Sequence, residues 1–240
     1  MNRDLDTNVR AAEESLKLAR FLKANNPEAD VDIEFMEDVL DVLKKYKKIA
    51  DGSDETEVVT ENIEGTDKND STESIDFAKL LRLTSVISSE KIREETRAAL
   101  LSAPKYFRRV PASSSGKYHP KYALGRGGLV RHTIAVVKIA DHMCNLEFLR
   151  VDAATRDKIL AACFLHDTRK QGMTDADSGH TVKDHAKLAS ETIEDQDISR
   201  MVLSHMGQWG RNKPGNMPQF IVHLADYLGS RKNIEVSMNG

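Results

Sequence analysis

Apolar residues recur at three- and four-residue spacing along most of the chain, which is the period of an amphipathic α-helix. Near the start this pattern covers residues 8–25 and 31–49, with Pro27 between them. Because proline ends a helix, the two segments are predicted to form an antiparallel helical pair. No segment shows the strict alternation of a half-buried strand, so the chain is predicted to be all-α.

A polar, acidic segment follows the helical pair. Residues 51–74 hold nine acidic side chains, one lysine and no aromatic residue, a composition that cannot offset the entropy of ordering. We therefore expect a helical pair over 1–50, a disordered acidic linker over 51–74 and a main domain over 75–240. The pair over 8–49 is a candidate for homo-oligomerisation or for docking a protein partner; alternatively, it packs on the main domain.

The helical period resumes at residue 75 and is interrupted by one long loop. This loop is rich in Pro, Ser and Gly and runs from Pro104 to about Gly128. On either side of it, helices are predicted at 75–87, 89–103, 129–147, 152–166, 183–194, 196–206 and 217–229.

Composition excludes secreted, disulfide-rich and membrane-spanning classes of protein. The two cysteines lie in apolar helical patterns, and the longest apolar run, residues 159–165, is far shorter than a membrane span. The start of the chain has no apolar signal region. We therefore expect a soluble, cytoplasmic protein without a membrane partner.

Charge is segregated along the chain, although the net charge is only −3. Residues 104–131 hold seven Lys or Arg side chains and no acid. A basic loop of this kind occurs on many soluble surfaces, but the complete absence of acids favours binding of an anionic substrate.

Potential metal ligands gather in the C-terminal half. Asp167 follows the apolar run "ILAACFLH", and Asp226 lies in "FIVHLADYLG". A carboxylate at the edge of a dry interior is costly unless a cation compensates its charge. A lone histidine such as His132 would more often be a hydrogen-bonded core residue, but two such acids indicate a divalent metal: Mn, Fe, Mg or Zn. The candidate ligands, in chain order, are His132, His166, Asp167, His185, His205 and Asp226.

His132, the doublet His166-Asp167 and Asp226, each on its own predicted helix, resemble the H…HD…D signature of the HD-domain superfamily of metal-dependent phosphohydrolases. Finer likeness, over about 104–232, is to the exoribonuclease branch named YhaM. There "GGLVRHT" resembles "GGLLEHT", "FLHDTRK" resembles "LLHDIGK", "LSHMGQWG" resembles the "SHHG" segment and "IVHLADYLGSRKN" resembles the aspartate-bearing last helix.

The resemblance implies an HD-domain helical bundle that binds one or two divalent metals. The first metal would be held by His132, His166, Asp167 and Asp226. His185 and His205 would hold the second, with Asp167 bridging. His180 competes with His185 as a ligand of this second metal. One departure from the branch also bears on it: Met206 stands where the branch often has another histidine.

The implied activity is a phosphohydrolase or phosphodiesterase that attacks a nucleotide or nucleic-acid phosphoester with a metal-activated water. Asp167 and Lys170 are the candidate catalytic residues; the alternative for Lys170 is a lysine that complements a helix C-terminus. Candidate substrate-binding residues, for which a surface or structural role is the alternative, are Lys117, His119, Arg126, Arg169 and Trp209.

The substrate is left open at this point. The exonuclease likeness favours RNA or DNA ends, whereas the absence of a β-rich partner domain favours a mononucleotide or a cyclic dinucleotide. From another class of protein, the alternative is a metal-stabilised nucleotide sensor or interaction module without turnover.

Overall fold

The computed structural model describes residues 71–113, 116–117, 119–175, 180–232 and 236. It also describes seven isolated helical positions nearer the start of the chain: Val9, Glu13, Lys17, Arg20, Glu37, Leu40 and Lys44. The chain divides into two compact units, Met1–Val58 and Val59–Gly240. The predicted linker lies outside the described residues as far as residue 70.

In the first unit, two ion pairs join the two segments that were predicted to be helical. Arg20 contacts Glu37 at 2.6 Å, and Lys44 contacts Glu13 at 3.0 Å. The later residue of one segment pairs with the earlier residue of the other, so the two segments run antiparallel at these positions. The rest of the predicted pair lies outside the described residues.

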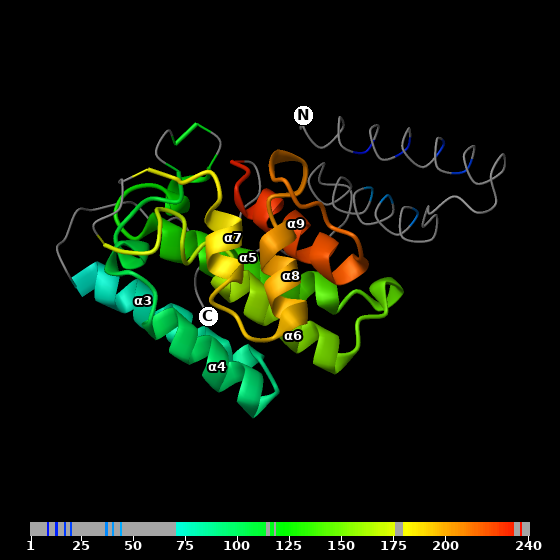
Figure 1. The fold of residues 1–240 in the computed structure, drawn as a ribbon, viewed down its shortest axis with the longest axis horizontal. Coiled ribbons are helices and arrows are strands. Elements are labelled where there is room, and N and C mark those ends of the chain that lie inside the picture. The colour runs from blue at the N-terminus through cyan, green and yellow to red at the C-terminus, as the bar shows by residue number, and fades with distance from the viewer. Residues whose placement is uncertain are drawn as a thin grey trace. The chain divides into compact units, whose positions relative to one another are not determined.

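The second unit is built from α-helices joined by short 3₁₀ turns, and its described residues contain no strand, which confirms the all-α prediction (Figure 1). The helices are α3 (Ser71–Leu83), α4 (Glu90–Leu101), α5 (Gly128–Cys144), α6 (Ala153–Leu165), α7 (His185–Ser190), α8 (Gln196–Ser204) and α9 (Met217–Gly229).

Helix α5 lies at the centre of this unit and packs against α6, α9 and α3. Helix α8 contacts both α6 and α9, α7 lies on α8, and α4 covers α6. In Figure 1, α3 and α4 lie on one side of α5 and α6, and α7, α8 and α9 lie on the other. Buried side chains of α5, α6 and α9, among them Leu129, Phe164 and Ile221, form the core. The helices that carry or directly precede the candidate ligands therefore pack against one another.

Short polar side chains fix the starts of the helices around the core. Asp152 accepts hydrogen bonds from the backbone N–H groups of Ala154 and Thr155 at the start of α6. Asp195 caps α8 and Asn216 caps α9 in the same way. Each cap satisfies N–H groups that have no partner inside the helix, so the start of each helix is well defined.

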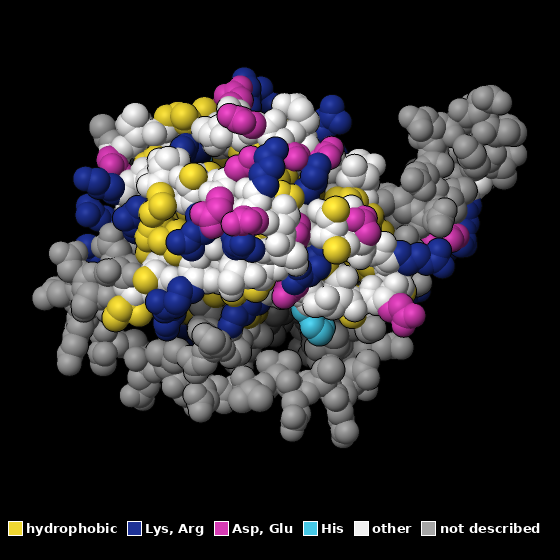
Figure 2. Space-filling view, turned by 90° about the horizontal axis from the view of Figure 1, so that it is seen from below, with side chains coloured by type: hydrophobic (Ala, Val, Ile, Leu, Met, Phe, Trp, Pro, Cys, Tyr) yellow, Lys and Arg dark blue, Asp and Glu magenta, His cyan; other side chains and the backbone are white. Residues whose placement is uncertain are grey.

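The face of the molecule seen from below carries charges of both signs. Figure 2 shows Lys and Arg side chains interspersed with Asp and Glu over this face. On α4, Lys91 lies 3.9 Å from Glu95, and Arg97 lies 3.9 Å from Glu94. Mixed charges of this kind create no strong field of one sign, so this face is a poor candidate for binding an anionic substrate.

Two expectations from composition concern the described helices. No helix in the described part of the chain is long and apolar enough to cross a membrane. Cys144 and Cys163 are buried and unpaired. Burial raises the pKa of the Cys144 thiol to about 12, so this thiol stays protonated at neutral pH.

Candidate metal centre

Five helix segments bring the six candidate ligands to one place. His132 lies on α5, His166 and Asp167 follow the last residue of α6, and Asp226 lies on α9. His185 is the first residue of α7, and His205 follows the last residue of α8. The four histidines and Asp167 are buried. Polar side chains of this kind rarely gather in a core unless they have a common partner.

The first group of ligand atoms surrounds one point between α5, α6 and α9. His132 Nε2 lies 3.0 Å from Asp226 Oδ1, and His166 Nε2 lies 3.7 Å from the same oxygen. His166 Nε2 is also 3.5 Å from Asp167 Oδ2. Adjacent ligands of one ion with bonds of about 2.1 Å lie roughly 3.0–3.4 Å apart, so these atoms have nearly the spacing of a single coordination sphere.

The second group uses the other oxygen of the same aspartate. Asp167 Oδ1 lies 3.3 Å from His185 Nε2 and 3.8 Å from His205 Nε2. The two imidazole nitrogens are 3.3 Å apart. Asp167 therefore faces the first group with Oδ2 and the second with Oδ1, which is the arrangement of a carboxylate that bridges two cations.

Three of the histidines are oriented by the same local hydrogen bond. Nδ1 of His166, His185 and His205 lies 2.7–2.9 Å from the backbone carbonyl three residues earlier. A carbonyl only accepts a hydrogen bond, so Nδ1 carries the proton and donates it. When the ring is neutral, Nε2 then keeps its lone pair, as a metal-binding histidine requires.

Buried polar atoms without a partner test whether these residues fit a metal. His166 Nε2 and Asp167 Oδ1 are both buried and form no hydrogen bond in the structure. Both atoms belong to the ligand groups, where a cation would satisfy them. The donors are nitrogen and oxygen without sulfur, which suits a borderline or hard divalent ion. The residues present therefore fit the metal.

Nearby cations keep Asp167 ionised in spite of its burial. Burial alone would raise the pKa of this carboxyl, but Lys170 and then His166 hold it well below its usual range. Lys170 Nζ donates to Asp167 Oδ2 at 2.5 Å. Burial, followed by the charge of His166, lowers the pKa of His205 to about 3. The site therefore presents a carboxylate and a neutral imidazole at neutral pH.

The structure places the two alternative histidines differently. His185 lies in the second ligand group, whereas His180 is exposed and belongs to neither group. Met206 follows His205 directly and is the N-cap residue of a 3₁₀ turn, Gly207–Trp209 (η5). The second group thus consists of Asp167 and two histidines.

The candidate substrate-binding residues lie in three different settings. His119 faces the ligands, with its ring centroid 5.5 Å from that of His132, while Lys117 and Arg126 are exposed on the same loop. Arg169 is buried near Tyr106, and its Nε has no hydrogen-bond partner. Trp209 is 57% exposed and stacks on Tyr227 with ring centroids 5.7 Å apart. Of these five, His119 is the one in ring contact with a ligand.

His223 supports the site although its sequence context marks it only as a core or helix-surface residue. Its Nδ1 lies 2.7 Å from the backbone carbonyl of His205, to which it donates a hydrogen bond. Gly207 lies directly against the same ring: a Cβ at this position would be 2.2 Å from a ring carbon of His223. His223 lies three residues before Asp226, and residues at this spacing share one face of a helix. This spacing was the signal in the sequence that could have placed His223 near the site.

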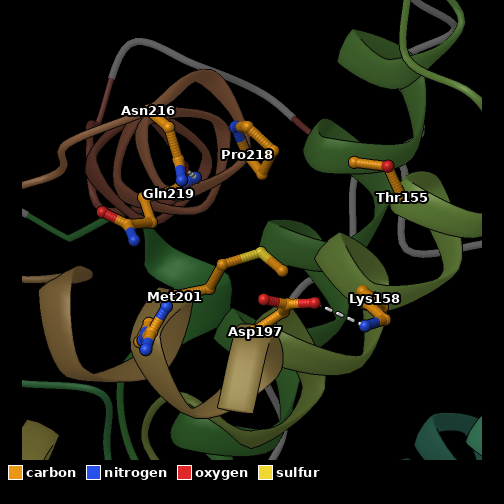
Figure 3. Close-up of a pocket in the computed structure, with 8 residues that line it drawn as sticks. Thr155, Lys158, Asp197, Met201, Asn216, Pro218 and Gln219 are labelled. Carbon is orange, nitrogen blue, oxygen red and sulfur yellow. Dashed lines mark hydrogen bonds and ion pairs between the residues drawn. The ribbon is translucent and has the colours of Figure 1, made fainter. Parts of the chain in front are cut away.

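A separate pocket of about 180 Å³ lies between α6, α8 and the start of α9 (Figure 3). None of its lining residues belongs to either ligand group. Its Lys158 pairs with Asp197 at 2.6 Å and with Asp195 at 3.1 Å, so the local charge is already compensated. The pocket is lined by Thr155, Lys158, Asp197, Arg200, Met201, Asn216, Pro218 and Gln219.

Comparison with known proteins agrees with this geometry. Residues 129–230 match the HD domain. The matched segment contains all six candidate ligands. HD domains bind divalent metals, and the two His/Asp groups described above are arranged to hold such ions.

A relative from Methanocaldococcus jannaschii extends the comparison beyond the matched segment. This protein, dihydroneopterin 2',3'-cyclic phosphate phosphodiesterase, is 29% identical over 177 residues, which cover 65% of this chain and 69% of the relative. The comparison with solved structures found no match. Together with the match to the HD domain, this similarity supports the assignment of the chain as a metal-dependent phosphohydrolase or phosphodiesterase, which is a hydrolase of phosphoester bonds.

Proposed function

We propose that the chain opens a cyclic phosphodiester on a small molecule that carries a planar heterocycle, such as a nucleoside or pterin 2',3'-cyclic phosphate. The observation that carries this proposal is the Asp167 carboxylate, whose two oxygens face two separate ligand groups. The similarity to an enzyme named for a 2',3'-cyclic phosphate substrate supports this choice among phosphoesters.

The six candidate ligands would hold two divalent ions, with Mn, Fe, Mg and Zn as the candidates that suit nitrogen and oxygen donors. His132, His166, Asp167 and Asp226 would hold the first ion, and Asp167, His185 and His205 the second. When bound, such ions neutralise phosphoryl oxygens and lower the pKa of a water molecule.

Hydrolysis of the ring then needs no redox partner. Water adds to phosphorus, one of the two ring P–O bonds breaks, and the proton of the water passes to the released alkoxide. The products are a phosphomonoester and a free hydroxyl on the neighbouring carbon. Because Lys170 Nζ lies against Asp167, at the edge of both ligand groups, it is placed to donate to a phosphoryl oxygen as charge develops there.

The surroundings of the site offer further contacts for such a substrate. Lys117 and Arg126 add positive potential on the loop that carries His119. Trp209 stacks on the buried Tyr227 and is itself exposed next to the segment that carries His205, and an exposed indole can stack on a heterocycle. Arg169 has a buried guanidinium beside Tyr106, and its Nε has no hydrogen-bond partner in the structure. This free donor favours a contact between Arg169 and an anionic group of the substrate.

The test is product analysis by mass spectrometry after incubation of Mn²⁺-loaded protein with a panel of phosphoesters. The panel contains 2',3'-cyclic nucleotides, dihydroneopterin 2',3'-cyclic phosphate, 3',5'-cyclic nucleotides, cyclic dinucleotides, deoxynucleoside triphosphates and short RNA. We expect the 2',3'-cyclic phosphates to gain one water in the wild type and to remain intact with Asp167→Ala.

Asp157→Asn is the matched control for this experiment. Asp157 is also buried, but it accepts hydrogen bonds from the backbone N–H groups of Ser88 and Ser89 and belongs to neither ligand group. The control should retain hydrolysis. Shortening of RNA from an end, with cyclic phosphates left intact, would overturn the proposed substrate class and favour the YhaM-like exonuclease activity.

A second candidate function is a nucleotide sensor that recruits a partner, or a second copy, through residues 8–49. The ion pairs Arg20–Glu37 and Lys44–Glu13 favour it, because they hold together a helical unit outside the HD domain. If every phosphoester in the panel is recovered intact, this sensor becomes the better account. Light scattering should then show assembly of the full chain that depends on added nucleotide.

A further inference from the structure

Backbone hydrogen bonds join the segment 119–127 to residues 109–112, which precede it in the chain. Ala112 N–H donates to the carbonyl of Ala123 at 3.0 Å, and Gly127 N–H donates to that of Arg109 at 3.1 Å. Gly128 packs so closely that a Cβ there would lie 2.3 Å from the Ala123 oxygen. These contacts fix Ala123 and Gly127 of the segment beside residues 109–112 and the start of α5.

Arg131, on the first turn of α5, binds the middle of this segment. Its Nε donates to the carbonyl of Tyr122 at 2.5 Å. A terminal nitrogen of the guanidinium, Nη2, donates to the carbonyls of Leu124 and Arg126, both at 2.9 Å. One side chain thus binds three backbone carbonyls within five residues, which the planar fork of an arginine can do and a single ammonium group cannot.

The remaining terminal nitrogen connects the segment to α3. Arg131 Nη1 donates to Asp76 Oδ2 at 2.6 Å, and both side chains are largely buried, with exposed fractions of 20% and 11%. Each of the three guanidinium nitrogens of Arg131 therefore donates to the protein itself. Arg131 belongs to the basic stretch that suggested anion binding, but its charge is matched by Asp76 and its role is structural support for the segment.

The segment 119–127 begins with His119. The His119 ring contacts that of His132, the candidate ligand that follows Arg131 in the chain. The His119 and His132 rings are in edge contact, with 64° between their planes. His119 Nδ1 is buried and has no hydrogen-bond partner in the structure. Lys170, Asp226 and Asp167 are close enough to influence His119 electrostatically. The segment therefore holds an imidazole with an unused buried nitrogen beside the place where a phosphate would bind.

We propose that Arg131 is a positioning residue that acts through His119: with Asp76 it holds the segment 119–127 so that His119 contacts the phosphoester of the substrate. This inference rests on the proposed function and deepens it, because it adds a substrate contact outside the H…HD…D ligands and names the residue that orients it. His119 is the group that touches substrate.

A double-mutant cycle on kcat/KM for the hydrolysed phosphoester tests the coupling. Loss of one hydrogen bond to a charged group predicts that His119→Ala lowers kcat/KM about 10- to 100-fold. Arg131→Gln should lower it about tenfold or more, and Arg131→Lys should not restore it. In the double variant the loss should equal that of His119→Ala alone. Losses that multiply would overturn the proposal, because they would show that the two residues act independently.

Arg156→Gln is the matched control for general destabilisation. Arg156 has a side-chain exposure of 21%, donates to Asp141 at 2.6 Å and to the carbonyl of Val86 at 3.0 Å, and touches neither the segment nor the ligands. We expect its loss to lower Tm as much as Arg131→Gln does but to leave kcat/KM within about twofold. An equal fall in kcat/KM for the control would show that the effect of Arg131 is only structural.

Amide hydrogen exchange separates this proposal from the proposed function. In Arg131→Gln, exchange of the amides in 119–127 should become at least about tenfold faster, while exchange in α6 and α9 stays unchanged. This result does not depend on turnover. Unchanged exchange in 119–127 would refute the positioning role even if hydrolysis is found, whereas faster exchange without any hydrolysis would refute only the proposed function.

Discussion

At the scale of single residues, the site depends on which atom of each ligand stays free. The Nδ1–H groups of His166, His185 and His205 are used by carbonyls one helical turn earlier, so each Nε2 is left for a cation. Asp167 has no such tether, and its two oxygens face the two groups. Lys170 donates to Asp167 Oδ2, the oxygen that also faces His166 Nε2.

This arrangement predicts separate roles for two lysines that both pair with aspartates. Lys170 and Lys158 have side-chain exposures of 14% and 28%, but only Lys170 lies beside the ligands. Lys170→Met should lower kcat about 100-fold because a donor to the transition state is lost, with KM and bound metal little changed. Lys158→Met should leave kcat within about twofold. Steady-state kinetics with metal analysis would refute the catalytic role of Lys170 if both variants behaved alike.

At the scale of elements, the turn after α8 determines where His205 and His223 meet. Gly207 has a φ of +50° and lies against the His223 ring, so the turn needs both a left-handed backbone and the absence of a side chain. His223 in turn donates to the carbonyl of His205. A helix end, a glycine turn and a neighbouring helix together position one ligand.

Gly207→Ala should therefore destabilise the protein more than a glycine substitution that only changes the backbone. Gly125 has a φ of +66° and nothing within 4 Å of its virtual Cβ, so Gly125→Ala measures the backbone cost alone, about 1 kcal/mol. Gly207→Ala adds overpacking against His223 and should cost about 2–5 kcal/mol. Thermal unfolding of both variants measures the difference, and equal losses would contradict the packing role of Gly207.

The bounds of the helices could be predicted from the sequence only in part. Residues 217–229 were predicted as a helix and form α9, because its apolar period begins directly after the capping residue Asn216. Helix α3 begins at Ser71 rather than at residue 75, since its first turn is polar and carries no apolar signal. Helix α7, predicted over 183–194, is confined to His185–Ser190.

Four candidate ligands, His132, His166, Asp167 and Asp226, could be recognised from their order and from the apolar helical segments that contain or directly precede them. The supporting contacts could not. Arg131 binds Asp76, 55 residues earlier, and His223 binds the carbonyl of His205, 18 residues earlier. No local sequence pattern predicts such contacts between distant residues, because they depend on how the helices pack.

At the scale of the whole molecule, the ligands tie together helices from distant parts of the chain. His132 and Asp226 are 94 residues apart and lie on helices that pack against each other across the core. Asp167 joins this first group to His185 and His205, which arrive from α7 and α8. Around this centre, residues 129–230, which match the HD domain, contain the candidate metal ligands, and the loop before α5 contains His119.

The central claim is that Asp167 joins two metal sites, and the most direct measurement is metal stoichiometry by inductively coupled plasma mass spectrometry after loading with Mn²⁺. The two ligand groups predict about two ions per chain in the wild type. His205→Ala removes a ligand of the second group only and should retain about one ion, whereas Asp167→Ala removes a ligand from both groups and should retain well below one. A wild type that binds a single ion, or an Asp167→Ala variant that binds as many ions as the wild type, would contradict the account.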